Sequence, residues 1–129
     1  MTDEEIRAAL ERHWAYTGRD ETISHEIYHE DAVLEFPQSG ERFVGTASFR
    51  PWRERYPSPI SMSIRRIRGS GDFWVAENEI TYVDGDDMWQ TVSIMELRDG
   101  KVAHESIYFA KPFEAPQWRS QWADRGSAG

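Results

Sequence analysis

The fold of this chain is decided by residues 60–110, which read ISMSIRRIRGSGDFWVAENEITYVDGDDMWQTVSIMELRDGKVAHESIYFA. Apolar residues recur there at every second position, the period of a half-buried β-strand. Polar, glycine-containing clusters interrupt the pattern at 69–72, 84–87 and 98–101, as turns between antiparallel strands do. We therefore predict a four-stranded antiparallel meander with strands at 60–68, 73–83, 88–97 and 102–109.

The first of these strands contains an irregularity. Ile60, Met62 and Ile64 alternate with polar residues, but Ile67 falls out of phase. One extra residue in a strand shifts the side-chain alternation in this way. The sequence therefore predicts a β-bulge at Arg65–Arg66.

The chain before the meander has the 3.6-residue period of helices. Thr2 and Glu5 have the spacing of a capping box, and an inward stripe follows up to Gly18. A second, shorter helix is expected to begin near Asp20 and to end within about two residues of His29, with Ile23 and Ile27 buried.

A short strand and a third helix complete this part. Residues 32–36 read as a strand that Pro37 ends. A turn at 38–41 follows, and the third helix begins after Gly45. Pro51 is tolerated only in the first turn of a helix, so we expect Ser48 to be the N-cap.

Helices segregated from strands predict an α+β fold. We expect one domain over residues 1–129, a cone-shaped curved sheet wrapped by three N-terminal helices, with the void between the first helix and the sheet. The tail at 110–129 contains Pro116, Trp118 and Trp122, and we expect it to pack on the body.

Composition and charge exclude several classes of function. The net charge is −8 and there is no cysteine, so disulfides and thiolate metal sites are excluded and nucleic acid is not an expected partner. The best basic cluster, Arg65, Arg66 and Arg68, fits a solvated face or ion pairs. No apolar stretch is long enough to cross a bilayer. We expect a cytoplasmic protein without a membrane partner.

Aromatic residues make up 13% of the chain and include six tryptophans. In a small acidic protein this content favours a stacked core and an apolar cavity. The expected ligand is a small hydrophobic molecule. The chain has no glycine-rich phosphate loop, no cysteine nucleophile and no Gly-x-Ser-x-Gly elbow, and we expect no cofactor.

Glu105 is the foremost catalytic candidate. Alternation places it with Ala103, Ile107 and Phe109 on an otherwise apolar strand face. Apolar surroundings disfavour the charged form of a carboxylate and raise its pKa, which suits a group that removes and returns a proton near neutral pH. The alternative is a structural glutamate on an exposed or dimer-facing surface, paired with an arginine.

His13 is the second catalytic candidate. It shares the inward stripe of the first helix with Ile6, Leu10 and Thr17. A neutral imidazole beside the void would assist proton transfer or hydrogen-bond a substrate carbonyl. The alternative is a core histidine satisfied by one backbone partner.

Further cavity residues are expected on the third helix and on strand faces. Trp52 and Tyr56 would form flat walls for a ring-shaped ligand. Asn78 and Ser93 interrupt apolar faces, and a polar residue there needs a partner. The predicted binding residues are Tyr16, Phe36, Trp52, Tyr56, Asn78, Ser93 and Met95. Plain core packing is the alternative for each.

His25-Glu26-Ile27-Tyr28-His29 matches the zinc-protease pattern H-E-x-x-H. With Ile23 and Ile27 buried, a helical spacing of 100° per residue places both histidines on the opposite, solvent face. The helix ends near His29 and no third histidine follows at the spacing of those proteases. A zinc hydrolase therefore remains a remote alternative, and we expect no metal site.

Several segments, in this order, resemble the nuclear transport factor 2-like superfamily and its SnoaL-like, polyketide cyclase-like members. They are YHEDAVLEFP at 28–37, Gly45, LRDGKV at 97–102, Tyr108-Phe109 and PFEAPQWR at 112–119. The resemblance spans nearly the whole chain. It implies a cone with a small-molecule pocket, in a superfamily of cyclases, isomerases, dehydratases, hydrolases and catalytically silent binders.

The resemblance also bears on particular residues. The general-base aspartate of ketosteroid isomerases corresponds to Phe36, their oxyanion-hole aspartate lies near Ser93, and their helix-one tyrosine lies near Arg12 or His13. All three positions depart from that pattern, so ketosteroid-type isomerisation by that constellation is not expected. SnoaL-like cyclases place an acid–base carboxylate on the last strand, where Glu105 lies.

Two functions follow with nearly equal weight. One is a cofactor-independent acid–base enzyme acting on a hydrophobic, carbonyl-bearing ring compound by isomerisation, cyclisation or dehydration. The other is a non-catalytic ligand-binding or dimeric accessory domain. A homodimer is expected, because apolar outer-face residues such as Val92 and Ile94 would otherwise be exposed to water.

Overall fold

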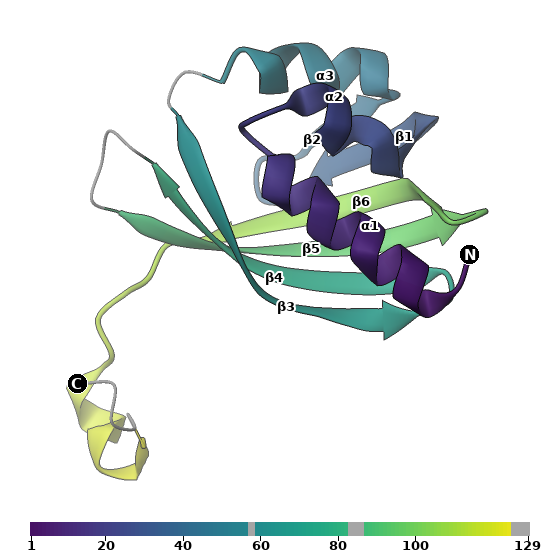
Figure 1. Cartoon of the computed structure of the whole chain (residues 1–129). Coiled ribbons are helices and arrows are strands. Elements are labelled where there is room, and N and C mark those ends of the chain that lie inside the picture. The colour runs from purple at the N-terminus through teal and green to yellow at the C-terminus, as the bar shows by residue number, and fades with distance from the viewer. Residues whose placement is uncertain (57–58, 83–86, 125–129) are drawn as a thin grey trace.

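The computed structural model describes residues 1–56, 59–82 and 87–124. Its centre is a curved sheet of six strands, with the helices gathered against one face (Figure 1). Four strands form the predicted antiparallel meander: β3 (Ile60–Ser70), β4 (Phe73–Tyr82), β5 (Met88–Arg98) and β6 (Lys101–Ala110). The meander is confirmed. Residues 83–86, which contain most of the predicted turn at 84–87, lie outside the described part of the chain.

The predicted bulge in β3 is also confirmed. The pairing of β3 with β4 shifts register between Ile64 and Arg66. The extra residue returns Ile67 to the buried face, where it is 6% exposed. Arg66 then points to the outer face and pairs with Glu77.

Two further strands extend the sheet beyond β6. β1 (Tyr28–Phe36) runs parallel to β6, and β2 (Glu41–Val44) pairs antiparallel with β1. The strand order is β2-β1-β6-β5-β4-β3. The parallel pairing places Leu34 beside Glu105, so the N-terminal half of the chain reaches the last strand.

The first helix, α1 (Asp3–Tyr16), forms as predicted. Its capping box is present: the Glu5 backbone N–H donates to the Thr2 hydroxyl at 3.1 Å, and the Thr2 N–H donates to the Glu5 carboxylate at 3.2 Å. The inward stripe packs on the sheet to form the core, and each fully buried large side chain contributes about 2 kcal/mol. The buried residues of α1 are Ile6, Leu10, His13 and Trp14.

The second helix is shorter than expected. α2 (Glu21–Ser24) is capped by Asp20 and passes into a 3-10 turn, η1 (His25–Ile27), and β1 then begins at Tyr28. The expectation that one helix carries both His25 and His29 is wrong, because the helical segment ends at Ile27 and His29 lies on β1. Pairing of Tyr28 with Val102 of β6 draws this segment into the sheet, and such tertiary pairing overrides a local helical pattern.

The third helix, α3 (Thr46–Glu54), begins before the expected cap. Gly45 is the N-cap, with a φ of 84° that turns the chain directly from β2 into the helix. Ser48 is therefore not the cap, although its hydroxyl donates to the Gly45 carbonyl at 2.7 Å. Pro51 lies inside the helix, and the packing of Phe49, which is 0% exposed, offsets its lost hydrogen bond.

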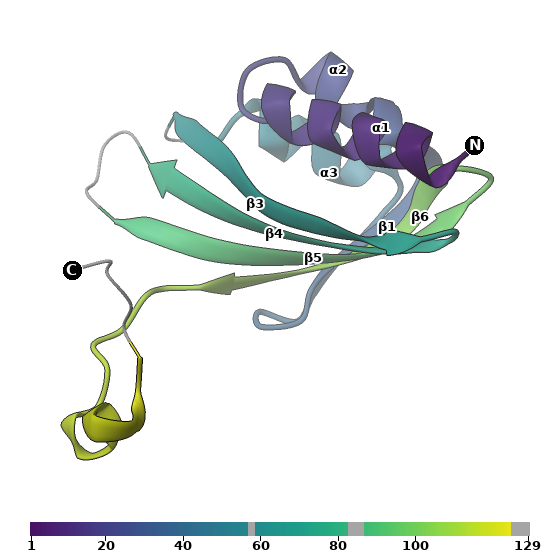
Figure 2. The same cartoon turned by 60° about the horizontal axis from the view of Figure 1, so that its bottom comes forward.

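The tail departs from its expected place. A short 3-10 helix, η2 (Gln117–Trp122), lies away from the body beyond the end of β6 (Figures 1 and 2). Trp118 and Trp122 are 73% and 74% exposed, so they do not pack on the body of their own chain. Pro112 and Pro116 lack the N–H groups that would continue strand pairing and lead the chain outward.

Candidate functional site

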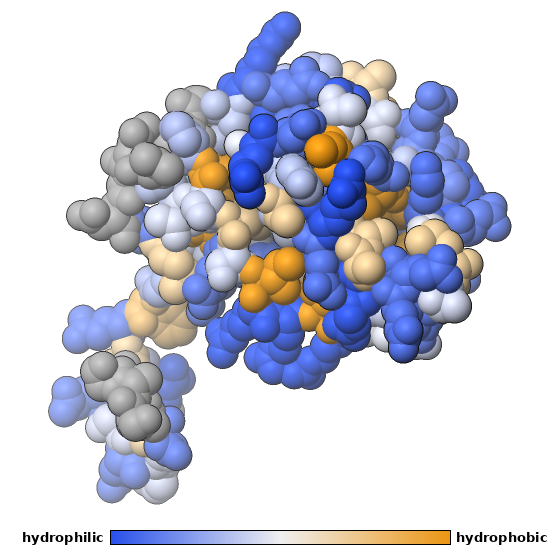
Figure 3. All heavy atoms as spheres, in the orientation of Figure 1, coloured by the Kyte–Doolittle hydropathy of each residue, from blue (hydrophilic) through white to orange (hydrophobic). Residues whose placement is uncertain are grey.

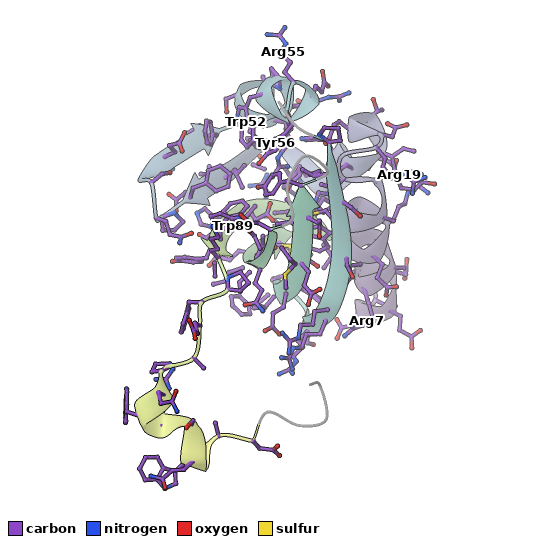
Figure 4. The ribbon with its side chains drawn as sticks, turned by 90° about the vertical axis from the view of Figure 1, so that its left-hand side faces the viewer. Arg7, Arg19, Trp52, Arg55, Tyr56 and Trp89 are labelled. Atoms are coloured by element: carbon purple, nitrogen blue, oxygen red, sulfur yellow. The ribbon has the colours of Figure 1, made fainter. Side chains whose placement is uncertain are left out.

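A cavity of about 580 Å³ lies between the helices and the concave face of the sheet. It is partly open to solvent, and Trp52, Tyr56 and Trp89 from its lining lie together at the end of the molecule that faces the viewer in Figure 4. Its walls are mostly apolar. The apolar lining residues are Trp14, Phe36, Trp52, Ile60, Met62, Ile80, Trp89, Ile107 and Phe109.

Glu105 lies in the wall of this cavity and is 1% exposed. It points inward because strand alternation places it on the same face as Met95 of β5 and Leu34 of β1, its register partners. Its carboxylate accepts hydrogen bonds at both oxygens. The Ser93 hydroxyl donates to Oε2 at 2.8 Å, and the Tyr28 hydroxyl donates to Oε1.

Tyr28 and Arg53 complete the surroundings of this carboxylate, and neither was predicted from the sequence to be a site residue. Arg53 Nη1 donates to the Tyr28 hydroxyl oxygen at 3.1 Å. Burial raises the pKa of Tyr28, and the neighbouring Glu105 raises it further. The phenol therefore stays protonated and can donate to Glu105 while it accepts from Arg53.

Arg53 is half-buried, and its guanidinium lies 5.5, 5.1 and 5.8 Å from the rings of Tyr28, Phe49 and Trp52. Burial by itself disfavours its charge, but Tyr28 and Glu105 outweigh this and raise the pKa of Arg53. Within the described residues no carboxylate lies within ion-pair distance of it. Since it also lines the cavity, its remaining N–H groups are available to a ligand oxygen.

A sequence signal for Arg53 existed. It follows Phe49 by four residues on α3, so the two share one helix face, and Phe49 is buried. Tyr28 offered no such signal. Its position beside Glu105 depends on the parallel pairing of β1 with β6, which no local pattern specifies.

His13 lines the cavity and is 3% exposed. Its Nδ1 lies 2.6 Å from the Ser24 carbonyl oxygen, which only accepts, so Nδ1 carries the proton and Nε2 is left as an acceptor. Burial, followed by the charge of Arg53, lowers the pKa of His13 to about 3. The imidazole is therefore neutral at ordinary pH.

The structure brings together only some of the other predicted residues. Phe36, Trp52, Tyr56 and Ser93 line the cavity. Tyr16, Asn78 and Met95 do not belong to its lining: Tyr16 lies between Arg12 and Arg19, and Met95 is 0% exposed in the core. The side-chain oxygen of Asn78 accepts from Trp14 Nε1 at 3.1 Å, so a protein group satisfies it.

The H-E-x-x-H histidines do not share a helix. His25 lies in η1, is 7% exposed and stacks on Phe49 at 5.7 Å, whereas His29 lies on β1 and bonds the Arg98 carbonyl. The expected solvent position of His25 is wrong, because the tighter 3-10 turn after Ser24 rotates it inward. In the described ranges no group of three or more His, Asp or Glu side chains is arranged to hold a metal.

The arrangement has a definite chemical capacity. A carboxylate and a guanidinium face an apolar-walled space, joined through the phenol of Tyr28. Charges act more strongly in such surroundings than in water. The site therefore combines a proton acceptor with a cation that stabilises a developing negative charge. None of the described helices is long and apolar enough to span a membrane.

The family model of the SnoaL-like domain matches residues 6–105. An NTF2-like protein of unknown function from Burkholderia xenovorans is 43% identical, with 98% of this chain and 99% of that chain covered and a TM-score of 0.90. A candidate ketosteroid isomerase from Kribbella flavida is 26% identical, with 99% and 95% covered and a TM-score of 0.84.

A candidate polyketide cyclase from Sinorhizobium meliloti shares the fold at 17% identity, with 80% of this chain and 93% of that chain covered and a TM-score of 0.64. No curated protein matches the chain. The predicted α+β cone and the predicted resemblance are both confirmed. The chain belongs to the SnoaL-like domain family, within the nuclear transport factor 2-like fold.

Proposed function

We propose that this chain binds a small, largely apolar, carbonyl-bearing ring compound in the cavity and acts on it as a cofactor-independent acid–base catalyst. One observation carries the proposal. Glu105 is almost completely buried in the cavity wall, yet it is held by Tyr28 and Ser93 and lies near an arginine that no carboxylate of the described residues pairs with. A buried, oriented carboxylate can abstract a proton next to a carbonyl, and a nearby cation can stabilise the charge that forms on the carbonyl oxygen.

The proposed step begins with the ionised carboxylate. Glu105 takes a proton from a carbon next to the substrate carbonyl, and the C–H electron pair moves onto the carbonyl oxygen as an enolate. Negative charge thus passes from Glu105 to the substrate, where an Arg53 N–H stabilises it. Return of this proton from Glu105 to another carbon is isomerisation, and its transfer from Glu105 to a β-hydroxyl, which then leaves as water, is dehydration. Attack of the enolate carbon on a second carbonyl, whose oxygen takes the electron pair of its C=O bond and then the proton from Glu105, is cyclisation.

His13 and the aromatic walls have supporting roles in this proposal. Nε2 of His13 accepts a hydrogen bond from a substrate hydroxyl, because Nδ1–H is engaged by Ser24. Trp52, Tyr56 and Phe36 form flat apolar walls that bind a ring and exclude water. The candidate ketosteroid isomerase of Kribbella and the candidate cyclase of Sinorhizobium support reactions of this class.

Hydrogen–deuterium exchange tests the proposal without knowledge of the natural substrate. A panel of cyclic ketones is incubated in D₂O, and loss of the α-proton signals is followed by NMR. The wild-type chain should accelerate exchange of at least one ketone, and Glu105→Gln should lower that rate about 100-fold or more. Glu96→Gln is the matched control, since Glu96 lies on the outer face of β5. Equal rates for wild-type and Glu105→Gln would contradict the proposal.

A binding protein without catalysis is the second candidate. One observation favours it: both oxygens of Glu105 already accept protein hydrogen bonds, as a purely structural carboxylate would. In that case ketones would bind, with chemical-shift changes at Trp52 and Tyr56, but no exchange would be accelerated.

We also propose that the chain forms a homodimer through the outer face of the sheet. Four side chains from β4, β5 and β6 form an apolar band there and are only half-buried or exposed: Val75, Val92, Ile94 and Tyr108. Such a band is typical of subunit contacts. Light scattering after size-exclusion chromatography tests this, and a 15.1 kDa species at micromolar concentration would contradict it.

A further inference from the structure

The tail carries the most exposed aromatic side chains of the described residues. We call residues 111–124 the aromatic tail. Phe113, Trp118 and Trp122 are 80%, 73% and 74% exposed, whereas exposed large apolar residues in a soluble chain are normally scattered singly. Figure 3 shows this segment standing clear of the body. The aromatic tail therefore has apolar surface that its own chain leaves uncovered.

The body fixes the direction in which the tail leaves. Lys111 forms an ion pair with Asp87 at 3.3 Å, and its ammonium lies 5.9 Å from the Trp89 ring. Pro112 and Pro116 then prevent further strand pairing. In Figure 2 the helices cover one side of the sheet and the tail lies on the other, so it emerges beside the outer face.

The tail is part of the likeness to solved structures. The match to the Burkholderia protein takes in 98% of this chain at a TM-score of 0.90, and the match to the Kribbella protein takes in 99%. Such coverage includes the aromatic tail. Three large aromatic side chains on one exposed segment gain free energy when another surface covers them, and the body of this chain does not cover them.

A candidate acceptor surface lies at the opposite end of the outer face. One row of register partners crosses the sheet there: Phe73, Glu96, His104, Val33 and Val44. Phe73 and Val44 are 52% and 60% exposed. The tail leaves from the other end of the strands, after Ala110.

We propose that the aromatic tail is an arm exchanged between two copies of this chain, with Trp118 and Trp122 packed on the Phe73–Val44 row of the second copy. This rests on the homodimer proposed above. In this dimer the two outer faces meet about a twofold axis, and the strands of the two copies run in opposite directions. The end of β6 in one copy then lies over the start of β4 in the other. Only residues 111–116 precede η2, and six extended residues span roughly 20 Å, so Trp118 and Trp122 stay near the end of β6 and thus near the start of β4 of the second copy.

The first test compares dimer affinity by sedimentation. In the full-length chain, Trp118→Ser with Trp122→Ser should raise the dimer dissociation constant about 100-fold or more, since buried tryptophans dominate interfaces. Arg119→Ser with Gln121→Ser changes the same 3-10 helix at exposed polar positions and should leave the constant unchanged. Equal affinity for the tryptophan variant and wild-type would overturn the arm and leave the outer-face dimer standing. A monomeric wild-type chain would overturn both.

The second test locates the tail. Because the chain has no cysteine, introduced cysteines react alone. A tagged Ser120→Cys chain is mixed with a Glu96→Cys chain and treated with a short bis-maleimide. A cross-link between the two chains is expected. Arg19→Cys on the helical side (Figure 4) replaces Glu96→Cys as the control and should not cross-link. Absence of a Ser120–Glu96 product, or an equal yield with Arg19→Cys, would overturn the proposal.

Discussion

The hydroxyl of Tyr28 donates a hydrogen bond to Glu105, joining the first residue of β1 to the middle of β6. The same hydroxyl oxygen accepts from Arg53 at 3.1 Å. One neutral phenol thus links the buried carboxylate to the cation that lines the cavity.

Tyr28→Phe removes the shared hydroxyl and keeps the ring. One oxygen of a buried carboxylate then lacks its donor, which costs about 1–3 kcal/mol of unfolding free energy. Urea denaturation measures the loss. Tyr108→Phe is the control, because Tyr108 is 41% exposed on the outer face, and it should change the free energy by less than about 0.5 kcal/mol. A Tyr28→Phe chain as stable as wild-type would show that the bond contributes nothing to folding.

His13 makes the stability of the fold depend on pH. The unfolded histidine binds a proton below pH 6.5, whereas burial and Arg53 lower the pKa of the folded one to about 3. Between pH 6.5 and about pH 3 the unfolded state therefore binds more protons than the folded state. The free energy of unfolding falls as the pH falls through this range, by about 1.4 kcal/mol per pH unit. Urea denaturation at pH 7, 6 and 5 should show a smaller slope for His13→Asn than for wild-type. Equal slopes for the two chains would contradict this assignment.

Arg53→Met should raise the pKa of His13. After burial, the charge of Arg53 is the largest cause that lowers this pKa, so its removal lets the imidazole protonate at a higher pH. NMR titration of the ring measures the change. Arg50→Met is the matched control, because Arg50 lowers the pKa of His25 and is not among the causes acting on His13. A His13 titration that Arg53→Met leaves unmoved would mean that the guanidinium lies farther away than described.

Trp52→Phe separates ligand binding from stability. Trp52 Nε1 is buried without a partner among the described residues, and an unpaired buried donor is unfavourable. The phenylalanine keeps an aromatic wall beside Phe36 and Phe43, so thermal stability should stay equal or rise slightly. Affinity for a cyclic ketone should fall severalfold, because the smaller ring offers the ligand less apolar contact. Phe43→Leu is the control, because Phe43 contacts Trp52 but is not part of the cavity lining, and an unchanged affinity in Trp52→Phe would show that Trp52 does not contact the ligand.

Local pattern alone determined much of the fold. The period of two in residues 60–110 predicted the meander, and the phase slip before Ile67 predicted the bulge. The capping box at Thr2 and Glu5 follows from spacing. The same alternation placed Glu105, and the helical stripe placed His13, toward the interior. These features depend on neighbours a few residues apart, whose geometry the backbone fixes.

Only the tertiary structure decided which residues surround Glu105. The parallel pairing of β1 with β6 places Tyr28 beside Glu105, 77 residues away in the sequence. The packing of α3 turns Arg53 toward the hydroxyl oxygen of Tyr28. The pairing of β1 in the sheet ended α2 early, and the 3-10 turn that follows buried His25. The prolines of the tail direct the chain outward, so Trp118 lies away from the body. Contacts between distant segments depend on how whole layers pack, and that choice is made by the summed burial of many side chains, which no single stretch of sequence contains.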